Sequence, residues 1–202
     1  MAALAADLGV RRTTEPERMN QELRDALARL CARGRRYDRL IPILKAHRQA
    51  ATPILVRLLA HPDPGWHTGA AAAFARMRAT PPNALPGLLR ILKSPDARAQ
   101  IAAIAALDWL PRTSQGRAIP AVIRLVQSRP VPELSFTATR AHLPRAVGAH
   151  FLGLHGGSRG RAVLARALRK RRDPIRHHIV AALEDAANAK ERATKARRRT
   201  TR

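Results

Sequence analysis

The sequence is poor in acidic residues. Its 202 residues include 38 lysines and arginines but only 14 aspartates and glutamates, so the formal net charge is +24 at pH 7. Charged residues make up 26% of the chain, close to the roughly 25% of ordinary globular proteins, so the sign of the charge is unusual and its amount is not. A protein with this imbalance attracts polyanions. The partners to consider are therefore nucleic acid, an anionic membrane surface and an acidic protein.

Lysine is also scarce, because 33 of the 38 cations are arginine. GC-rich coding would produce such a bias without any selection for binding. It explains arginine over lysine, but it does not explain the shortage of aspartate and glutamate.

Cysteine and aromatic residues are rare as well. The single cysteine, Cys31, excludes a disulfide framework and any cysteine-based zinc site. It falls in an apolar pattern with Leu23, Leu27 and Leu30, which predicts a buried structural thiol. Aromatic residues make up 3% of a chain whose apolar residues are mostly Ala, Leu, Ile and Val. This composition suits a helical core and is poor for a β-sandwich.

No apolar stretch approaches the roughly 18 residues that a membrane span requires. The segment 1–17 contains Asp7, Glu15 and Glu17 and has no basic stretch before its apolar one. It therefore resembles neither a secretory nor a transit signal, and the expected location is cytoplasmic.

The chain repeats itself. Segments that begin at Pro53, Pro86 and Pro120 align without gaps, and a weaker fourth copy begins at Ala162. Proline at the first helical turn costs no hydrogen bond, and the Pro-Asp or Asp-Pro pairs that follow are typical of a turn that caps the next helix. Each copy is thus predicted to be a helical hairpin. A hairpin this short cannot bury both apolar faces alone, so the copies are expected to stack into an α-solenoid.

The repeated segments resemble the HEAT-like repeat family. The resemblance is strongest in the segment 94–107 (SPDARAQIAAIAAL) and looser in 144–154 and 174–183. The resemblance covers about residues 50–187. It implies an all-α fold: a right-handed α-solenoid of about four HEAT-like hairpins, with units at about 51–80, 84–111, 118–155 and 160–187. It implies no particular function, because such repeats serve unrelated purposes.

The remaining segments are predicted as additions to the repeats. Residues 1–16 are expected to be a flexible N-terminus, 17–50 to be capping helices, and 188–202 to be a basic tail that frays from the last helix. The third unit is longer than the others because 127–142 intervene between its helices. That insertion is predicted to be a protruding loop or an extra short helix.

The charge is distributed unevenly along the chain. Residues 159–202 hold 15 cations and 4 acids, almost half of the excess. In addition, one arginine recurs at the same position of successive first helices, so stacking would align these arginines in a ladder. The predicted nucleic-acid-binding residues are the ladder (Arg57, Arg90, Arg124, Arg166) and the basic clusters (Arg169, Lys170, Arg171, Arg172, Lys195, Arg197, Arg198, Arg199). The alternative is that these are merely exposed positions in an arginine-rich chain.

A second recurring set, Arg98, Arg145 and Arg176, lies near the starts of the second helices. We expect these arginines to bond to turn carboxylates and carbonyls, such as those near Asp96 and Asp173. This role would be structural rather than ligand-binding.

No catalytic motif is present. The sequence contains no phosphate-binding Gly-rich loop, no nucleophile elbow and no HExxH, and the glycines of 153–160 are predicted to form a helix C-cap and connector. The histidines have no carboxylate or cysteine at ligand spacing, so neither a metal nor a cofactor is expected.

One enzymatic possibility comes from fold analogy alone. Some HEAT-like solenoids resemble the bacterial alkylpurine DNA glycosylases, in which tryptophans and an aspartate surround the damaged nucleotide. Here only Trp66, Trp109 and Asp108 could serve. Trp109 fits the apolar pattern as a core residue, which argues against that role.

The sequence therefore predicts a non-enzymatic solenoid that binds nucleic acid, DNA or RNA, through phosphate contacts. The competing prediction is a protein-interaction scaffold that uses the concave solenoid face, with the basic tail incidental or directed at an acidic protein.

Overall fold

All regular structure in the described part of the chain is helical, with no strand. The structure is a computed structural model that describes residue 25 and residues 37–128, 143–169 and 173–200, with backbone alone for 37–39 and 197–200. The elements are α2 (Tyr37–Ala46), α3 (Arg48–Leu58), α4 (Pro64–Met77), the 3-10 turn η1 (Pro82–Ala84), α5 (Leu85–Ile91), α6 (Ala97–Leu107), α7 (Arg112–Gln127), α9 (Leu143–His155), α10 (Gly157–Leu168) and α11 (Arg176–Thr200).

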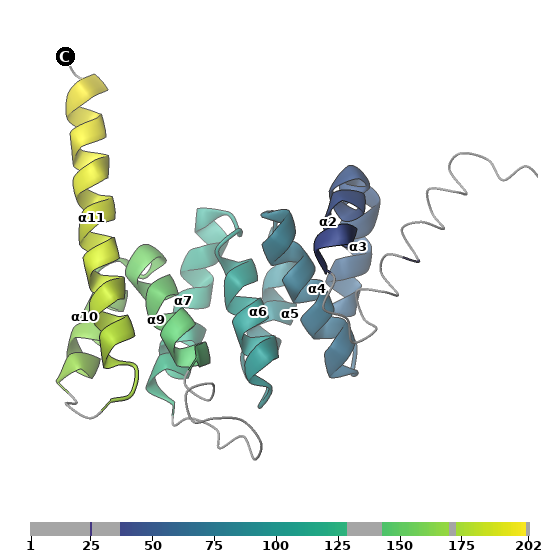
Figure 1. Ribbon diagram of the computed structural model, residues 1–202, viewed down its shortest axis with the longest axis horizontal. Helices are drawn as coiled ribbons and strands as arrows, with labels where there is room; N and C mark the ends of the chain where they lie inside the picture. Colours follow the sequence, from purple (N-terminus) through teal and green to yellow (C-terminus); the bar gives the residue numbers. More distant parts are fainter. Residues whose placement is uncertain (1–24, 26–36, 129–142, 170–172, 201–202) are drawn as a thin grey trace, which may run out of the picture.

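The helices from α3 onward form two rows. Consecutive helices pack in pairs: α3 with α4, α5 with α6, α7 with α9, and α10 with α11. The second helices of the pairs also pack side by side in the order α4, α6, α9, α11, and α5, α7 and α10 do the same among the first helices. We call α3, α5, α7 and α10 the first-helix row and α4, α6, α9 and α11 the second-helix row. Figure 1 shows the pairs following one another across the molecule from α2 to α11.

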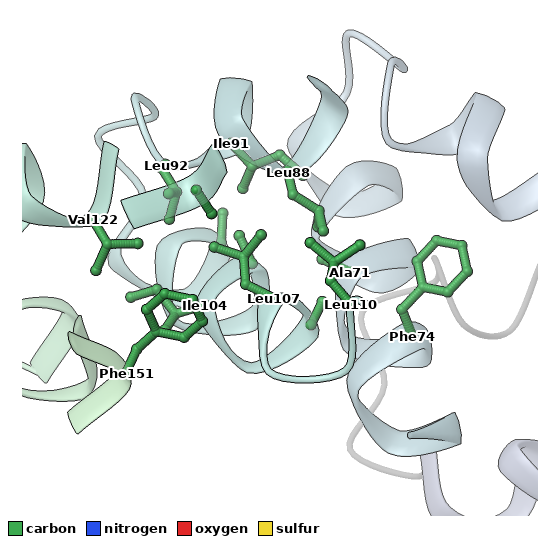
Figure 2. Packing of buried hydrophobic residues seen from close by; sticks show 14 of the residues in the cluster. Ala71, Phe74, Leu88, Ile91, Leu92, Ile104, Leu107, Leu110, Val122 and Phe151 are labelled. Atoms are coloured by element: carbon green, nitrogen blue, oxygen red, sulfur yellow. The ribbon is translucent and has the colours of Figure 1, made fainter. Parts of the chain in front are cut away.

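One apolar core runs between the rows. Leu88 and Ile91 of α5 lie over Ile104 and Leu107 of α6, and Phe151 of α9 approaches Ile104 from the next pair (Figure 2). All five side chains are almost completely buried. Each pair thus completes the core of its neighbour, as expected for short hairpins that cannot bury both of their faces alone.

The Pro-Asp and Asp-Pro turns cap the second helices as predicted. The Asp63 carboxylate accepts a hydrogen bond from the backbone N–H of Gly65 at 2.7 Å, and the Asp96 carboxylate accepts one from Arg98 at 2.8 Å. Asp173 accepts one from Ile175 at 3.2 Å. These bonds satisfy amide groups that would otherwise lack a partner at a helix start.

The prediction that the repeated prolines begin helices is right for Pro86 and wrong for Pro53 and Pro120. Pro86 lies in the first turn of α5, whereas Pro53 and Pro120 lie inside α3 and α7. An interior proline leaves the carbonyl four residues earlier without its helical donor. Here those carbonyls belong to Gln49 and Gly116, both exposed, so water can replace the lost bond.

The chain ends also differ from the predictions. The helix expected to reach residue 50 is broken at His47, where α2 ends and α3 begins. The tail predicted to fray at residue 188 is helical, because α11 continues without a break to Thr200. Four parts of the predictions lie outside the described residues: most of 17–36 in the capping segment, the Cys31 thiol, the 1–16 segment and most of the 127–142 insertion.

The glycines of 153–160 form a tight connector between two helices, as predicted. Gly156 and Gly157 join α9 to α10, and Gly157 has a φ of +57°, which favours glycine. Gly153 serves packing instead. A Cβ placed there would lie 2.4 Å from the carbonyl oxygen of Ala182, so this glycine lets α9 and α11 approach closely. No described helix is long and apolar enough to cross a bilayer.

Candidate nucleic-acid interface

The first-helix row is strongly and uniformly basic. Its four helices contain no aspartate, glutamate or lysine, and every one of their arginines is exposed. The nine arginines are Arg48, Arg57, Arg90, Arg112, Arg117, Arg124, Arg159, Arg161 and Arg166. The first-helix row therefore carries nine positive charges that no acidic residue of the same helices offsets.

The second-helix row has few arginines before α11. Helices α4, α6 and α9 contain one arginine each, namely Arg76, Arg98 and Arg145, and Arg145 is buried. The described acidic residues lie mostly at the turns that precede these helices or on α11. Before α11, which carries both cations and acids, the second-helix row is thus much less basic than the first-helix row.

The predicted ladder lies at one end of the first-helix row. Arg57, Arg90 and Arg166 are in the last turn of α3, α5 and α10, and Arg124 is in the last turn of α7. All four are exposed. None of them has an acidic group within 4 Å among the described residues.

Arg90 differs from the other three ladder residues. Its guanidinium donates a hydrogen bond to the carbonyl oxygen of Leu59, just after α3. Gly87 of α5 also faces Leu59, and a Cβ at Gly87 would lie 2.7 Å from the Leu59 Cβ. Arg90 therefore helps to join α3 to α5, whereas Arg57, Arg124 and Arg166 make no such bond to a described residue.

The sequence interpretation missed two arginines of the same face. Arg117 precedes Arg124 by seven residues in α7, and Arg159 precedes Arg166 by seven residues in α10. Residues seven apart lie on one face of a helix, two turns from each other. The basic surface thus extends two turns along α7 and α10, and the seven-residue spacing was the signal for it.

A groove between α5 and α7 reaches this surface. It encloses about 410 Å³, and the cations Lys93 and Arg124 line it together with Gln100 and Ser128. No acidic side chain lines it among the residues that the structure describes. The groove offers cations and uncharged polar groups of the kind that contact phosphates.

The predicted C-terminal clusters are described in part. Arg169 is exposed directly after α10, and residues 170–172 lie outside the described residues. Lys195 is exposed on α11 and pairs with Glu191 at 2.7 Å. Arg197, Arg198 and Arg199 lie in the last turns of α11, where the structure describes the backbone alone.

In the second recurring set, Arg145 and Arg176 form side-chain bonds to neighbouring elements. Arg145 donates from Nε to the carbonyl of Val126 at 2.9 Å and forms an ion pair with Asp173 at 2.8 Å, and Arg176 donates to the carbonyl of Leu168. The structural role is confirmed for both. The Arg98 side chain has no such bond to any described residue.

The carbonyls that accept these bonds occupy equivalent positions in the repeats. Leu59, Leu92, Val126 and Leu168 each lie two residues after a ladder arginine, at the end of a first helix. Their carbonyls accept bonds from Arg90, Gln100, Arg145 and Arg176 respectively. At the end of each first helix, a carbonyl that lacks a helical donor thus accepts a hydrogen bond from a long side chain.

The three residues considered for a glycosylase site do not come together. Thr80, just after α4, bonds to the backbone of Ala106 and Trp109, so the C-terminal ends of α4 and α6 are adjacent. Trp66, in the first turn of α4, is therefore about 16 Å along the helix from that end. Trp109 is 42% exposed, so its prediction as a core residue is wrong. The Arg78 guanidinium lies 5.4 Å from the centre of its ring, a cation–π contact that holds the indole at the surface.

Asp108 lies in a second cavity, of about 550 Å³, with Arg112, Gln115 and His155. Its Oδ1 is 3.3 Å from Nε2 of His155.

At the start of α11, the His177 and His178 rings are 3.9 Å apart. Partial burial, and then the neighbouring His177, lower the pKa of His178 below 6.5.

No cluster of three histidine, cysteine or acidic side chains suited to a metal ion occurs in the described ranges. No protein-family model matches the sequence, and no curated protein matches it significantly.

Proposed function

We propose that this chain is a right-handed α-solenoid of about four HEAT-like hairpins that binds nucleic acid through its phosphates and is not an enzyme. The single observation that carries the proposal is the charge of the first-helix row, where nine arginines are exposed and no acidic residue occurs. A solvated surface would tolerate aspartate or glutamate at some of these positions.

The ladder costs free energy until an anion neutralises it. Packed helices are about 8–10 Å apart, so neighbouring ladder arginines repel each other by about 0.4 kcal/mol in water. That cost is small for each pair but recurs along the row. Duplex DNA carries one negative charge per about 1.7 Å of its axis, enough to place a phosphate near every exposed arginine.

The same row offers little for reading bases. Helices α3, α5, α7 and α10 contain no aromatic residue on which a base could stack. Phosphate contacts fix register and orientation but carry no sequence information. The proposed binding is therefore strong at low salt, weak at high salt and nearly independent of sequence.

The test replaces arginines that have no structural bond. In a triple variant, Arg57, Arg124 and Arg166 become Gln, and Arg90 is left intact because it bonds to Leu59. Arg98→Gln on the second-helix row is the matched control. Affinity for a random 24-base-pair duplex, measured by fluorescence anisotropy, should fall uniformly across sequences in the triple variant. The slope of log K against log salt should lose about one unit per arginine.

The control should bind as the wild type does. Equal affinities of the triple variant and Arg98→Gln would contradict a role for the first-helix row. Binding would then lie elsewhere, with the basic C-terminal segment as the first candidate.

A protein-interaction scaffold is the second candidate, and one observation favours it. Trp109 and Leu154 are both more than 40% exposed, and Leu154 lines the cavity that contains Asp108 and His155. Exposed apolar side chains beside a cavity are typical of sites that take a partner side chain. Failure of every nucleic acid to bind at low salt would favour this candidate.

A further inference from the structure

The second half of α11 projects from the body of the molecule. Figure 1 shows it rising well beyond α9 and α10 towards the C-terminus. Ile179, Ala182 and Ala186 are buried against the rest of the fold, whereas every residue from 187 to 196 is exposed. The 14 residues from Ala187 to Thr200 therefore extend about 21 Å as a helix.

This projection has features that keep it helical without tertiary packing. It grows from a helix already fixed by its buried half, so no new nucleation is needed. Glu191 and Lys195 form an i,i+4 ion pair of the favourable orientation at 2.7 Å. Cations near the C-terminus also interact favourably with the helix dipole.

The projection is also the most basic part of the chain. Residues 187–200 contain six cations and one acid. At 100° per residue, Ala189, Ala193 and Ala196 share one face. Lys190 lies about 90° to one side of the centre of that face, and Arg192 lies about 70° to the other side. The narrow face is thus flanked by cations on both sides.

We propose that this projection lies in the major groove of duplex DNA. A helix with side chains is about 10–12 Å wide and fits a groove about 12 Å wide. The alanine face lets the helix backbone come close to the groove floor, while Lys190 and Arg192 reach the phosphates of opposite strands. At 3.4 Å per base pair, the helix spans about six pairs.

The inference rests on the proposed function and selects one nucleic acid. The major groove of duplex RNA is deep and too narrow for side chains to read, and a single strand has no groove. A flexible basic tail, by contrast, would bind all three by charge alone. Discrimination between them therefore depends on the helix.

The experiment breaks the helix without changing its charge. Full-length wild type, Ala193→Pro and the control Ala193→Ser are titrated against duplex DNA, duplex RNA and single-stranded DNA of one length at one salt concentration. Ala193 is exposed and lies beyond the packed half of α11, so the thermal midpoint should stay the same in all three proteins. Circular dichroism should show helix loss in Ala193→Pro only.

The wild type and Ala193→Ser should prefer duplex DNA, and Ala193→Pro should lose about tenfold in affinity for it while binding single strands as before. Duplex DNA whose major groove is filled by glucosylated hydroxymethylcytosine should bind the wild type as weakly as unmodified duplex binds Ala193→Pro.

Two results would overturn the inference. The first is that Ala193→Pro binds duplex DNA as tightly as the wild type, or that the wild type binds all three nucleic acids equally. The projection would then bind by non-specific electrostatic attraction, and only this inference would fail. If nothing binds even at low salt, the proposed function fails as well.

Discussion

The buried ion pair between Arg145 and Asp173 gives the sharpest stability prediction. The two side chains are 10% and 7% exposed, and they join α9 to the turn before α11. Arg145→Met would leave the Asp173 carboxylate without its cation and the Val126 carbonyl without the Nε donor. Removing one partner of a buried pair costs about 3–5 kcal/mol, because the remaining charge stays buried and uncompensated.

For a chain of this size, 1 kcal/mol shifts the thermal midpoint by about 2–4 °C, so Arg145→Met should lower it by about 6–20 °C. Urea unfolding followed by circular dichroism gives the free energy directly. The control is Arg98→Met, an exposed member of the same recurring set without a side-chain bond, which should change stability by less than about 0.5 kcal/mol.

The double variant with Asp173→Asn separates the pair from the packing. It should be more stable than Arg145→Met alone, because it removes the orphaned charge. A loss of less than about 1 kcal/mol in Arg145→Met is the value of an exposed pair, and it would show that the Arg145–Asp173 pair does not behave as a buried one.

Two further predictions concern the glycines and the histidine pair. Gly153→Ala should cost about 1–3 kcal/mol in urea unfolding, because its Cβ would meet the Ala182 carbonyl. Gly116→Ala, with nothing within 4 Å, should instead stabilise by about 0.5–1 kcal/mol, and equal effects would contradict the close approach of α9 and α11. The His178 ring should titrate below 6.5 by NMR. His177→Gln should raise that midpoint. Because the unfolded chain takes up the proton first, the wild-type folded state should lose stability as pH falls from above 6.5 to the lowered midpoint.

The local signals in the sequence predicted the helices well because each has a nearby physical cause. Asp63, Asp96 and Asp173 precede helices at the spacing of an N-cap, and all three do cap. Pro53 and Pro120 misled the prediction, because a proline is acceptable inside a helix when water can reach the carbonyl it leaves unpaired. That access depends on tertiary exposure, which a repeat pattern does not record.

The candidate nucleic-acid interface was predicted only in part, because contacts between helices are not recorded in the repeat pattern either. The repeat aligned the four ladder arginines, but it could not show that Arg90 bonds across to Leu59, since the two are joined only when α3 and α5 pack. Nor could the apolar pattern show that Trp109 is held at the surface by Arg78. The basic first-helix row emerges only when residues are sorted by the layer they occupy.

The salt dependence of duplex binding is the decisive test of phosphate contacts by the exposed arginines. If at least six arginines contact phosphates, log K should fall against log salt with a slope of about −5 or steeper. Affinity should then drop by about a thousandfold between 50 and 200 mM salt. Absence of binding at the lower salt, or a slope near zero, would contradict the account.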